Sequence, residues 1–201
     1  MIKVAAFDIG KVLLDFDYGI FVRRMAPRTQ MDVPALDAFL NQSPLLAQYE
    51  SGRLTSSEFF TVVQKETGFD GTEAEFAAYF EDIFTPIDEI ITLQATLAAR
   101  GLPTYTLSNT NEMAVRHISR AYDFWPRFTG HILSHEVKAL KPDPKIYEVF
   151  EEITGCLGNE IVYLDDRSEN IVAGKNRNWN AIEHRNGADT REALICLGVL
   201  P

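Results

Sequence analysis

Residues 3–17, KVAAFDIGKVLLDFD, contain a short apolar run that ends on a carboxylate, Asp8. A second apolar run follows, and it ends with Asp15 and Asp17. A strand that is buried on both faces of a parallel sheet has an almost unbroken apolar sequence of this kind. A charged side chain at the end of such a strand is expected to have a use there. The stretch therefore raises two questions, namely what Asp8 does and why Gly10 lies two residues further on.

Four further segments have the composition of short strands, and helical apolar spacing separates them. Alternating strands and helices imply parallel pairing through right-handed crossovers. We therefore expect an α/β protein, with a Rossmann-like parallel sheet between two helical layers. The predicted strands are residues 2–8, 103–108, 131–134, 161–165 and 179–183. The predicted helices between them are residues 87–100, 111–121, 144–154 and 170–178.

Residues 16–86 depart from this alternation, because they show helix-like spacing and no strand pattern. Thr55 followed by Glu58 in TSSEFF is the signature of a capping box at a helix start. An unstructured connection of this length is improbable inside a compact domain. We predict a core domain of residues 1–15 and 87–201, interrupted by a helical cap domain at 16–86. The segments with helical spacing are residues 33–41, 55–67 and 72–84.

Composition restricts the partners of this chain of 201 residues. Hydrophobic residues make up 46% and charged residues 24%, as in ordinary soluble globular proteins. The net charge of −10 argues against nucleic acid or an anionic membrane as a partner. We see neither a signal peptide nor an apolar run long enough to span a membrane. Cys156 and Cys196 do not form a CxxC motif, which suits reduced thiols, so we expect a cytoplasmic protein.

Polar residues gather where the predicted strands end, which is where doubly wound sheets bind their ligands. The first strand ends in FD, the second in TLSN and the fourth in VYLDD, while ALKPDPKIY follows the third. One crevice at the edge of the sheet would therefore hold several carboxylates, a hydroxyl, an amide and a lysine. The residues concerned are Asp8, Ser108, Asn109, Lys141, Asp165 and Asp166.

This set of side chains suits phosphoryl transfer. A carboxylate such as that of Asp8 can attack phosphorus and form an aspartyl phosphate. Because the attack brings two anions together, a cation is needed, and Asp8 with Asp166 supplies the hard oxygen ligands that Mg²⁺ prefers. Lys141 can neutralise phosphate charge. Ser108 and the amides near Asn109 can donate hydrogen bonds to the phosphate oxygens.

Four motifs in this order resemble those of the haloacid dehalogenase (HAD) superfamily, namely FDIGKVLLD, TLSNTN, LKPDPKIY and YLDDRSENI. The chain looks like the phosphatase-type members that carry a helical cap after the first strand, in the branch with a D-x-G-x-V motif. The segment AGKNRNWNAIEHRNGADTREAL is similar to the last helix and strand of the family. The resemblance implies a magnesium-dependent hydrolase that dephosphorylates a small phosphorylated metabolite, for example a sugar phosphate.

The resemblance also implies a role for each matching residue. Asp8 would be the nucleophile and a Mg²⁺ ligand. The backbone carbonyl of Gly10 and the carboxylate of Asp166 would be further ligands, and Asp165 and Asn170 would support the metal and its waters. The helical cap would close over the substrate and set its specificity. The phosphate would be held by Ser108, Asn109 and Lys141. Lys141 would also be a catalytic residue.

Gly10 departs from the common pattern of the family. Most phosphatases of this type have an aspartate there, which protonates the leaving oxygen and later activates the hydrolytic water. General acid–base catalysis of this kind contributes roughly 10²- to 10⁴-fold to the rate. Three explanations are open. The substrate has a good leaving group, such as a sugar 1-phosphate or an acyl phosphate; or Asp15, Asp17 or Glu50 replaces the aspartate; or the protein binds phosphate compounds with little turnover.

Two other functions are compatible with the motifs. In a hydrolytic 2-haloacid dehalogenase a similar aspartate attacks carbon without a metal, and that branch also lacks the second aspartate. Asp165 and Asp166 argue against this function, because without a metal they would repel the nucleophile. A catalytically weak phosphate-binding or regulatory protein would also tolerate Gly10.

Two segments give further expectations. Asn178 falls where the family commonly has a glycine that ends the last core helix, in the left-handed conformation that Asn tolerates. In the cap, YESGR resembles the family's segment near the active site. We expect at least two of Tyr49, Glu50 and Arg53 to be structural residues.

Overall fold

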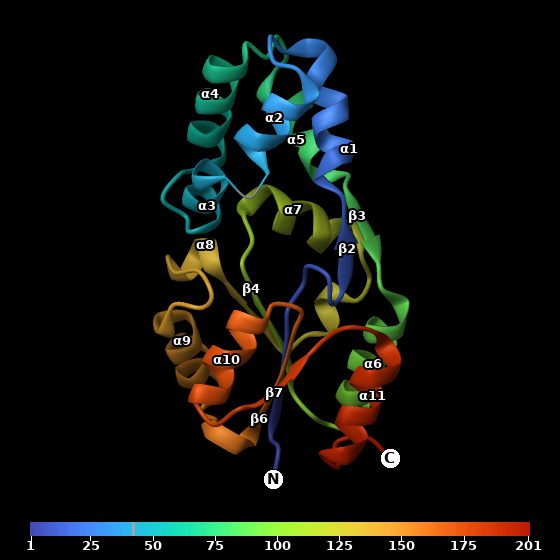
Figure 1. Ribbon diagram of the computed structural model, residues 1–201. Coiled ribbons are helices and arrows are strands. Elements are labelled where there is room, and N and C mark those ends of the chain that lie inside the picture. The colour runs from blue at the N-terminus through green and yellow to red at the C-terminus, as the bar shows by residue number, and fades with distance from the viewer. Residues whose placement is uncertain (42) are drawn as a thin grey trace.

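The protein is described by a computed structural model that covers residues 1–41 and 43–201. Figure 1 shows a sheet flanked by helices, with a group of helices at one end. The sheet has five parallel strands in the order β5-β4-β1-β6-β7. The predicted fold class is confirmed, and each predicted strand is found to within two residues. The strands are β1 (Val4–Phe7), β4 (Thr104–Ser108), β5 (Gly130–Leu133), β6 (Ile161–Asp165) and β7 (Asn180–Glu183).

Strand β1 lies at the centre of the sheet, and all four of its residues are buried. Its alternate side chains enter two different apolar clusters. Ala5 and Phe7 pack in the cluster that contains residues of α6, α7 and α11, whereas Val4 and Ala6 pack in the cluster with residues of α9 and α10. The apolar run is therefore unbroken because both faces of the strand are covered. The core helices are α6 (Asp88–Ala99), α7 (Glu112–Ala121), α8 (Ser134–Val137), α9 (Pro144–Thr154), α10 (Ser168–Asn176) and α11 (Gly187–Cys196).

The topology places the end of β1 at the point where the strand order reverses. From β1 the chain continues to β4 on one side, and it later returns to β6 on the other side. In sheets of this type the crevice at the carboxyl ends of such strands is where ligands bind. Asp8, the residue after β1, therefore lies at the ligand-binding edge of the sheet. Its backbone N–H donates to the carbonyl oxygen of Leu164 at 2.9 Å, which continues the ladder by one residue.

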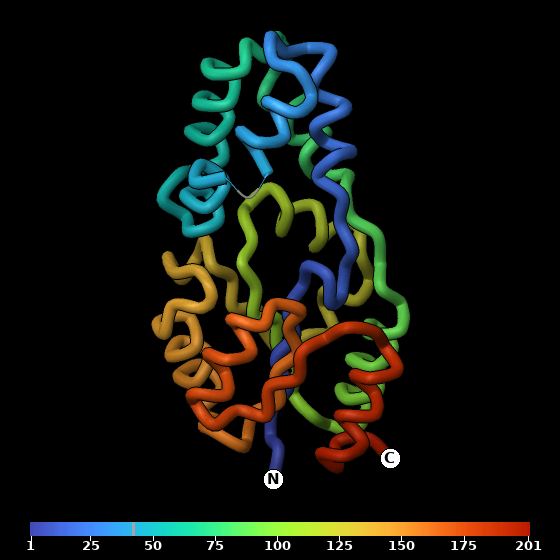
Figure 2. The backbone as a smooth tube through the Cα atoms, in the orientation of Figure 1, coloured from blue at the N-terminus to red at the C-terminus, as the bar shows by residue number. Residues whose placement is uncertain are grey.

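Residues 16–86 are hereafter called the helical insert, and their described residues form five α-helices around an apolar cluster that Met113 of α7 also joins. Figures 1 and 2 show this group of helices beyond the carboxyl end of the sheet. Many side chains of this cluster are aromatic. The rings of Phe76 and Phe80 contact each other, and each also contacts Phe21 and Phe59. The helices are α1 (Tyr18–Met25), α2 (Val33–Leu40), α3 (Pro44–Glu50), α4 (Ser56–Thr67) and α5 (Glu73–Glu81).

In the helical insert the structure differs from the prediction made from the sequence. Helices α1 and α3 are absent from the prediction, although α1 has the same length of eight residues as α2, which was predicted. Two strands were also not expected, namely β2 (Leu14–Phe16) and β3 (Phe84–Pro86). They pair only as a two-stranded antiparallel ribbon, and three residues are too few for an alternating pattern. Helix α5 consequently ends before the predicted boundary at residue 84.

The β2–β3 ribbon contains both connections between the core and the helical insert. Asp15 lies opposite Thr85, and Phe16 lies opposite Phe84. The tube in Figure 2 shows the two segments running side by side away from the sheet. Because the segments are hydrogen-bonded to each other, the insert is attached to the core through one paired ribbon.

Two local predictions are confirmed by backbone geometry. The Thr55 hydroxyl accepts from the Glu58 N–H at 3.2 Å, and the Glu58 carboxylate accepts from the Thr55 N–H at 2.8 Å, which completes the capping box of α4. Asn178 has a φ of 61°, the left-handed conformation expected after α10. Within residues 1–41 and 43–201 no helix is long and apolar enough to cross a membrane.

The capping box gives a first prediction, on stability. Thr55→Ala removes the hydroxyl that accepts from an otherwise unpaired helix N–H, so it should lower the free energy of unfolding by about 1 kcal/mol. Urea denaturation followed by circular dichroism measures this loss. Thr61→Ala is the matched control in the interior of the same helix, where the hydroxyl only bonds the carbonyl of Ser57. An equal loss in both variants would contradict the role of the cap.

Candidate active site

A cavity of about 720 Å³ lies at the carboxyl end of the sheet, between the core and the helical insert. Loops after β1, β4 and β6 contribute its floor, and residues of α1 and α3 contribute to its opposite wall. The structure brings together at this cavity every site residue predicted from sequence except Asp165, which is buried beneath it. The predicted residues that line the cavity are Asp8, Gly10, Ser108, Asn109, Lys141, Asp166 and Asn170.

Asp8 is held in place by the loop that follows β1. One of its carboxylate oxygens, Oδ1, accepts from the Ile9 N–H at 2.8 Å and lies 3.0 Å from Nζ of Lys141. The side chain is 10% exposed, enough to face the cavity. Burial, and then the negative charge of Asp165, raise the pKa of Asp8 to about 7, whereas the positive charge of Lys141 and the hydroxyl of Ser108 oppose that rise. The contacts with Lys141 and the Ile9 N–H fix the direction of the side chain.

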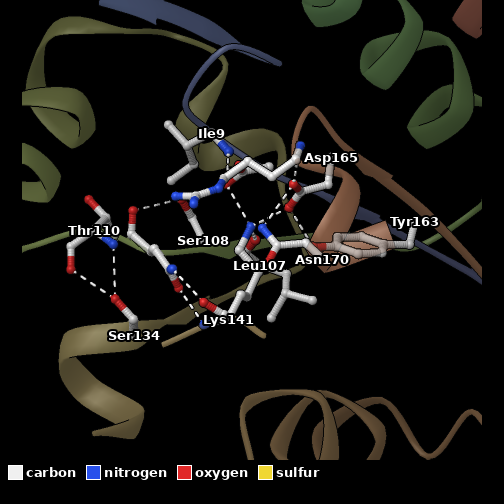
Figure 3. A network of polar contacts seen from close by, with 12 residues as sticks. Ile9, Leu107, Ser108, Thr110, Ser134, Lys141, Tyr163, Asp165 and Asn170 are labelled. Atoms are coloured by element: carbon white, nitrogen blue, oxygen red, sulfur yellow. Dashed lines mark hydrogen bonds and ion pairs between the residues drawn. The ribbon is translucent and has the colours of Figure 1, made fainter. Parts of the chain in front are cut away.

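Lys141 is the buried cation of the site (Figure 3). Its ammonium group donates to the Leu107 carbonyl at 2.8 Å and to Asp165 Oδ2 at 2.6 Å, in addition to its contact with Asp8. Burial alone would lower the pKa of Lys141, but the charges of Asp8 and Asp165 outweigh it and raise that pKa above its ordinary value. An ammonium group has three protons, and each has a partner within the protein. Lys141 therefore neutralises the carboxylates of Asp8 and Asp165. A phosphate that contacts Lys141 would share its ammonium group with these two side chains.

Asp165 and Asp166 are adjacent in sequence but differ in environment. Asp165 is fully buried and accepts from Lys141, from the hydroxyl of Tyr163, from the Arg167 N–H at 2.9 Å and from the Asn170 side chain at 2.9 Å. With its oxygens engaged in this way, Asp165 positions its neighbours. Asp166 is half-buried and lines the cavity. Carboxylate oxygens of Asp8, Asp165 and Asp166 all lie within 4.8 Å of one another.

The oxygen atoms around Asp8 and Asp166 fit a hard divalent cation. The side-chain oxygen of Asn170 is buried without a hydrogen-bond partner in the described part of the chain, which is unusual for a buried polar atom. Asn170 and Gly10 both line the same cavity, and the Gly10 carbonyl oxygen accepts no hydrogen bond from any described residue. Carboxylate, carbonyl and amide oxygens of this kind, with water, are the ligands that Mg²⁺ prefers.

Hydrogen-bond donors for a phosphate come from the ends of β1 and β4. The Ser108 hydroxyl is buried at the cavity. The Asn109 side chain, by contrast, is already used, because it accepts from the Lys141 N–H at 2.7 Å and donates to the Lys141 carbonyl at 3.0 Å. The backbone N–H groups of Asn109 and Gly10 have no partner among the described residues. These two N–H groups are therefore the donors that remain available.

A side chain at position 10 would meet the ring of Phe16. A Cβ atom added to Gly10 would lie 2.8 Å from Cε1 of the Phe16 ring, closer than van der Waals contact allows. The φ angle of Gly10 is not in the left-handed region, so backbone conformation does not require glycine there. Phe16 lines the cavity and packs edge-on against Tyr18 at 5.5 Å and against Phe84 at 6.4 Å. An aromatic ring thus takes the space next to the position where a second aspartate would begin.

The structure separates the three carboxylates proposed as substitutes for that aspartate. Asp15 is exposed and pairs with Lys11. Asp17 is also exposed, and it caps α1 by accepting from the Gly19 N–H at 2.7 Å. Glu50, the last residue of α3, lines the cavity. Of the three, only Glu50 is placed where it faces Asp8 across the same cavity.

The other two residues singled out near Glu50 lie outside the cavity lining. Tyr49 is buried, stacks on Phe59 at 4.4 Å and accepts a hydrogen bond from the Met113 N–H at 3.1 Å. Arg53 is exposed. Tyr49 therefore has a structural position between the insert and the core, and Arg53 has no contact with the cavity.

Sequence reasoning missed the cavity residues that α1 and the start of α3 contribute. Tyr18, Asn41 and Ser43 line the cavity, and none was predicted as a site residue. A signal for one of them exists in the sequence. Ser43 is an N-cap residue that precedes a proline at the first helical position, which is a common helix start.

Comparison with known proteins agrees with this geometry. The sequence model of the haloacid dehalogenase-like hydrolases matches residues 2–176. A D-ribitol-5-phosphate phosphatase of Bacteroides thetaiotaomicron is 25% identical over 98% of both chains. A sesquiterpene phosphatase of Aspergillus oryzae is 24% identical over 86% of this chain and 85% of the relative.

Solved structures share the same fold. One is a HAD family enzyme of Bacteroides thetaiotaomicron in complex with magnesium and inorganic phosphate. It superposes with a TM-score of 0.80 at 22% identity, over 93% of this chain and 96% of that one.

The contact between Gly10 and Phe16 gives a second prediction. Gly10→Ala forces a methyl group against the ring, so it should lower the free energy of unfolding by about 1–3 kcal/mol in urea denaturation. In a Phe16→Leu background, which lacks the ring edge, the same substitution should have a smaller effect. A loss of equal size in both backgrounds would show that the ring is not what requires glycine.

Proposed function

Because the chain belongs to the haloacid dehalogenase-like hydrolase family, we propose that it is a magnesium-dependent phosphatase that uses Asp8 as its nucleophile. The observation that carries this proposal is the cluster of Asp8, Asp165 and Asp166 around the buried ammonium of Lys141, at the floor of a cavity. Two relatives named as phosphatases, and a related structure that holds magnesium and inorganic phosphate, support it.

The chain's own residues account for the first half of the reaction. A carboxylate oxygen of Asp8 attacks phosphorus, and an aspartyl phosphate forms as the bond to the leaving oxygen breaks. Ser108 and the free N–H groups of Gly10 and Asn109 donate to the phosphate oxygens, where negative charge accumulates. Lys141 keeps Asp8 oriented and offsets its charge.

Magnesium fits the oxygen donors beside Asp8. Asp8, the Gly10 carbonyl and Asp166 would hold the ion, and Asp165 and Asn170 would support it and its waters. When bound, Mg²⁺ supplies positive charge that lets two anions approach and stabilises the charge that develops on phosphorus.

The walls of the cavity favour an uncharged leaving group. The helical insert contributes hydroxyl, amide and apolar side chains and a single carboxylate, but no lysine or arginine among its described residues. The cations at the rim, Lys11 and Arg167, come from the core and already pair with Asp15 and Glu169. A second anionic group on the substrate would therefore meet the charge of Glu50 and would have to compete with Asp15 or Glu169 for a cation. These features support a monophosphate of a small neutral metabolite, such as a sugar or a polyol.

The helical insert acts as a cap in this proposal, and residues 1–15 and 87–201 form the core domain. Direct contacts join the two parts. Glu81 of α5 pairs with Arg116 of α7, and Ser56 donates to Glu112 at 2.5 Å. Both cysteines are free thiols, which supports the proposal of a reducing, cytoplasmic location.

The nucleophile is tested by Asp8→Asn. The amide cannot form the aspartyl phosphate, so turnover of phosphate esters in Mg²⁺ should fall by at least about 10³-fold while the far-UV circular dichroism is unchanged. Asp123→Asn is the matched control, because Asp123 is exposed and lies outside the cavity lining. Phosphatase activity that survives in the Asp8 variant would rule out the proposed mechanism.

Removal of the metal separates the phosphatase from a dehalogenase. We expect EDTA to abolish phosphate release from p-nitrophenyl phosphate, and added Mg²⁺ to restore it, since three carboxylates within 4.8 Å need a cation before an anionic ester can approach. Halide release from a 2-haloacid is the parallel assay. Halide release that continues in EDTA, without any phosphate release in Mg²⁺, would favour the dehalogenase.

A further inference from the structure

Glu50 is the carboxylate that the helical insert places in the cavity. Among the described cavity-lining residues of the insert it is the one acidic side chain, and it comes from the C-terminal end of α3. No described residue donates a hydrogen bond to the Glu50 carboxylate. We propose that Glu50 is the general acid and base of the hydrolysis, in place of the aspartate that Gly10 does not supply.

The core fixes the position of Glu50 through its backbone. The Ser134 hydroxyl lies 2.6 Å from the Glu50 carbonyl oxygen, to which it donates, and it accepts from the Thr110 N–H at 2.9 Å. Ser134 is fully buried, at the start of α8, and Figure 3 shows it beside Thr110. Thr110 belongs to the same loop as Ser108 and Asn109. One hydroxyl group therefore connects Glu50 to the loop that holds the proposed phosphate donors.

The turn after Glu50 is fitted closely to the core as well. Gly52 has a φ of +64°, and a Cβ atom there would lie 2.1 Å from the carbonyl oxygen of His135. The Gly52 carbonyl accepts from the Lys138 side chain at 2.7 Å. Both contacts are with α8 or the residue that ends it. The end of α3 thus docks on α8, and this docking brings Glu50 over the cavity.

The charges around Glu50 suit a group that donates and then accepts a proton. Asp8 faces it from the end of β1, Arg167 from the loop after β6 and Tyr18 from α1. Burial, and then the charge of Asp8, raise the pKa of Glu50 to about 7, while Arg167 opposes that rise. A carboxyl group in this range is present in both forms near neutral pH, which is where an acid–base catalyst is most effective.

The proposal rests on the phosphatase function and completes its proton balance. In the first step Asp8 bonds to phosphorus, the bond between phosphorus and the leaving oxygen breaks, and the Glu50 proton passes to that oxygen. In the second step a water molecule bonds to phosphorus and gives its proton to the Glu50 carboxylate. The bond between phosphorus and Asp8 then breaks, which releases phosphate and restores both side chains.

The test is how strongly the effect of Glu50→Gln depends on the leaving group. Phenyl phosphate and p-nitrophenyl phosphate have nearly the same shape, but phenol is the weaker acid and its departure needs the proton more. We expect the variant to lose about 10²-fold in kcat/KM on phenyl phosphate and no more than about 10-fold on p-nitrophenyl phosphate. Glu66→Gln, an exposed carboxylate of the insert that lies outside the cavity lining, is the matched control and should match the wild type.

A second measurement follows the water-activation step. With p-nitrophenyl phosphate the Glu50 variant should release one equivalent of nitrophenol in a burst and then turn over slowly, because the aspartyl phosphate waits for a base. Equal losses on both esters without a burst would show that Glu50 is only structural and would overturn the proposal, although the phosphatase function would stand. A wild-type enzyme that hydrolyses neither these esters nor any member of a panel of sugar phosphates in Mg²⁺ would overturn the phosphatase function itself.

Discussion

The buried ammonium of Lys141 is the interaction on which the site depends. Asp8 and Asp165 stand at the ends of adjacent central strands, and both are almost removed from solvent. Two carboxylates at that depth would repel each other and would be poorly solvated, so neither would stay ionised without a cation between them. Lys141 lies within 3.0 Å of both and also bonds the carbonyl of Leu107 in β4. The contacts of Lys141 therefore connect the ends of β1, β4 and β6 to the segment after β5 and α8, in which Lys141 lies.

The same cluster explains how much of the site was readable from sequence. A carboxylate that ends an apolar run signals an unusual environment, and the ends of parallel strands converge wherever the alternation of strands and helices is clear. Asp8, Ser108, Lys141 and Asp166 were predicted on these grounds, and the structure places them around one cavity. The family was identified for the same reason, since its motifs are those strand ends. The side chain of Asn109 bonds the backbone of Lys141, a contact that spacing does not reveal, so the phosphate contact proposed for this residue is made by its backbone N–H.

The prediction omitted helices α8 and α11 of the core, and in the helical insert it omitted α1, α3 and the β2–β3 ribbon. The ribbon has three residues in each strand, which is too few for an alternating pattern. Short elements of this kind are stabilised mainly by tertiary contacts. The choice among Asp15, Asp17 and Glu50 could not be made from sequence for the same reason. It depends on the docking of α3 on α8, a contact between segments far apart in the chain.

If Glu50 is the general acid, in place of an aspartate at position 10, the cap itself takes part in catalysis. An aspartate on the β1 loop is present whether or not the insert is docked, whereas Glu50 reaches the cavity only through the hydrogen bond to Ser134 and the turn at Gly52. With the insert displaced, Asp8 and Lys141 would remain in place, but the leaving oxygen would have no proton donor. Esters with poor leaving groups would then react only in the docked form. Docking would thus select substrates by leaving group as well as by shape, and the ring of Phe16 would maintain this arrangement by keeping a side chain away from position 10.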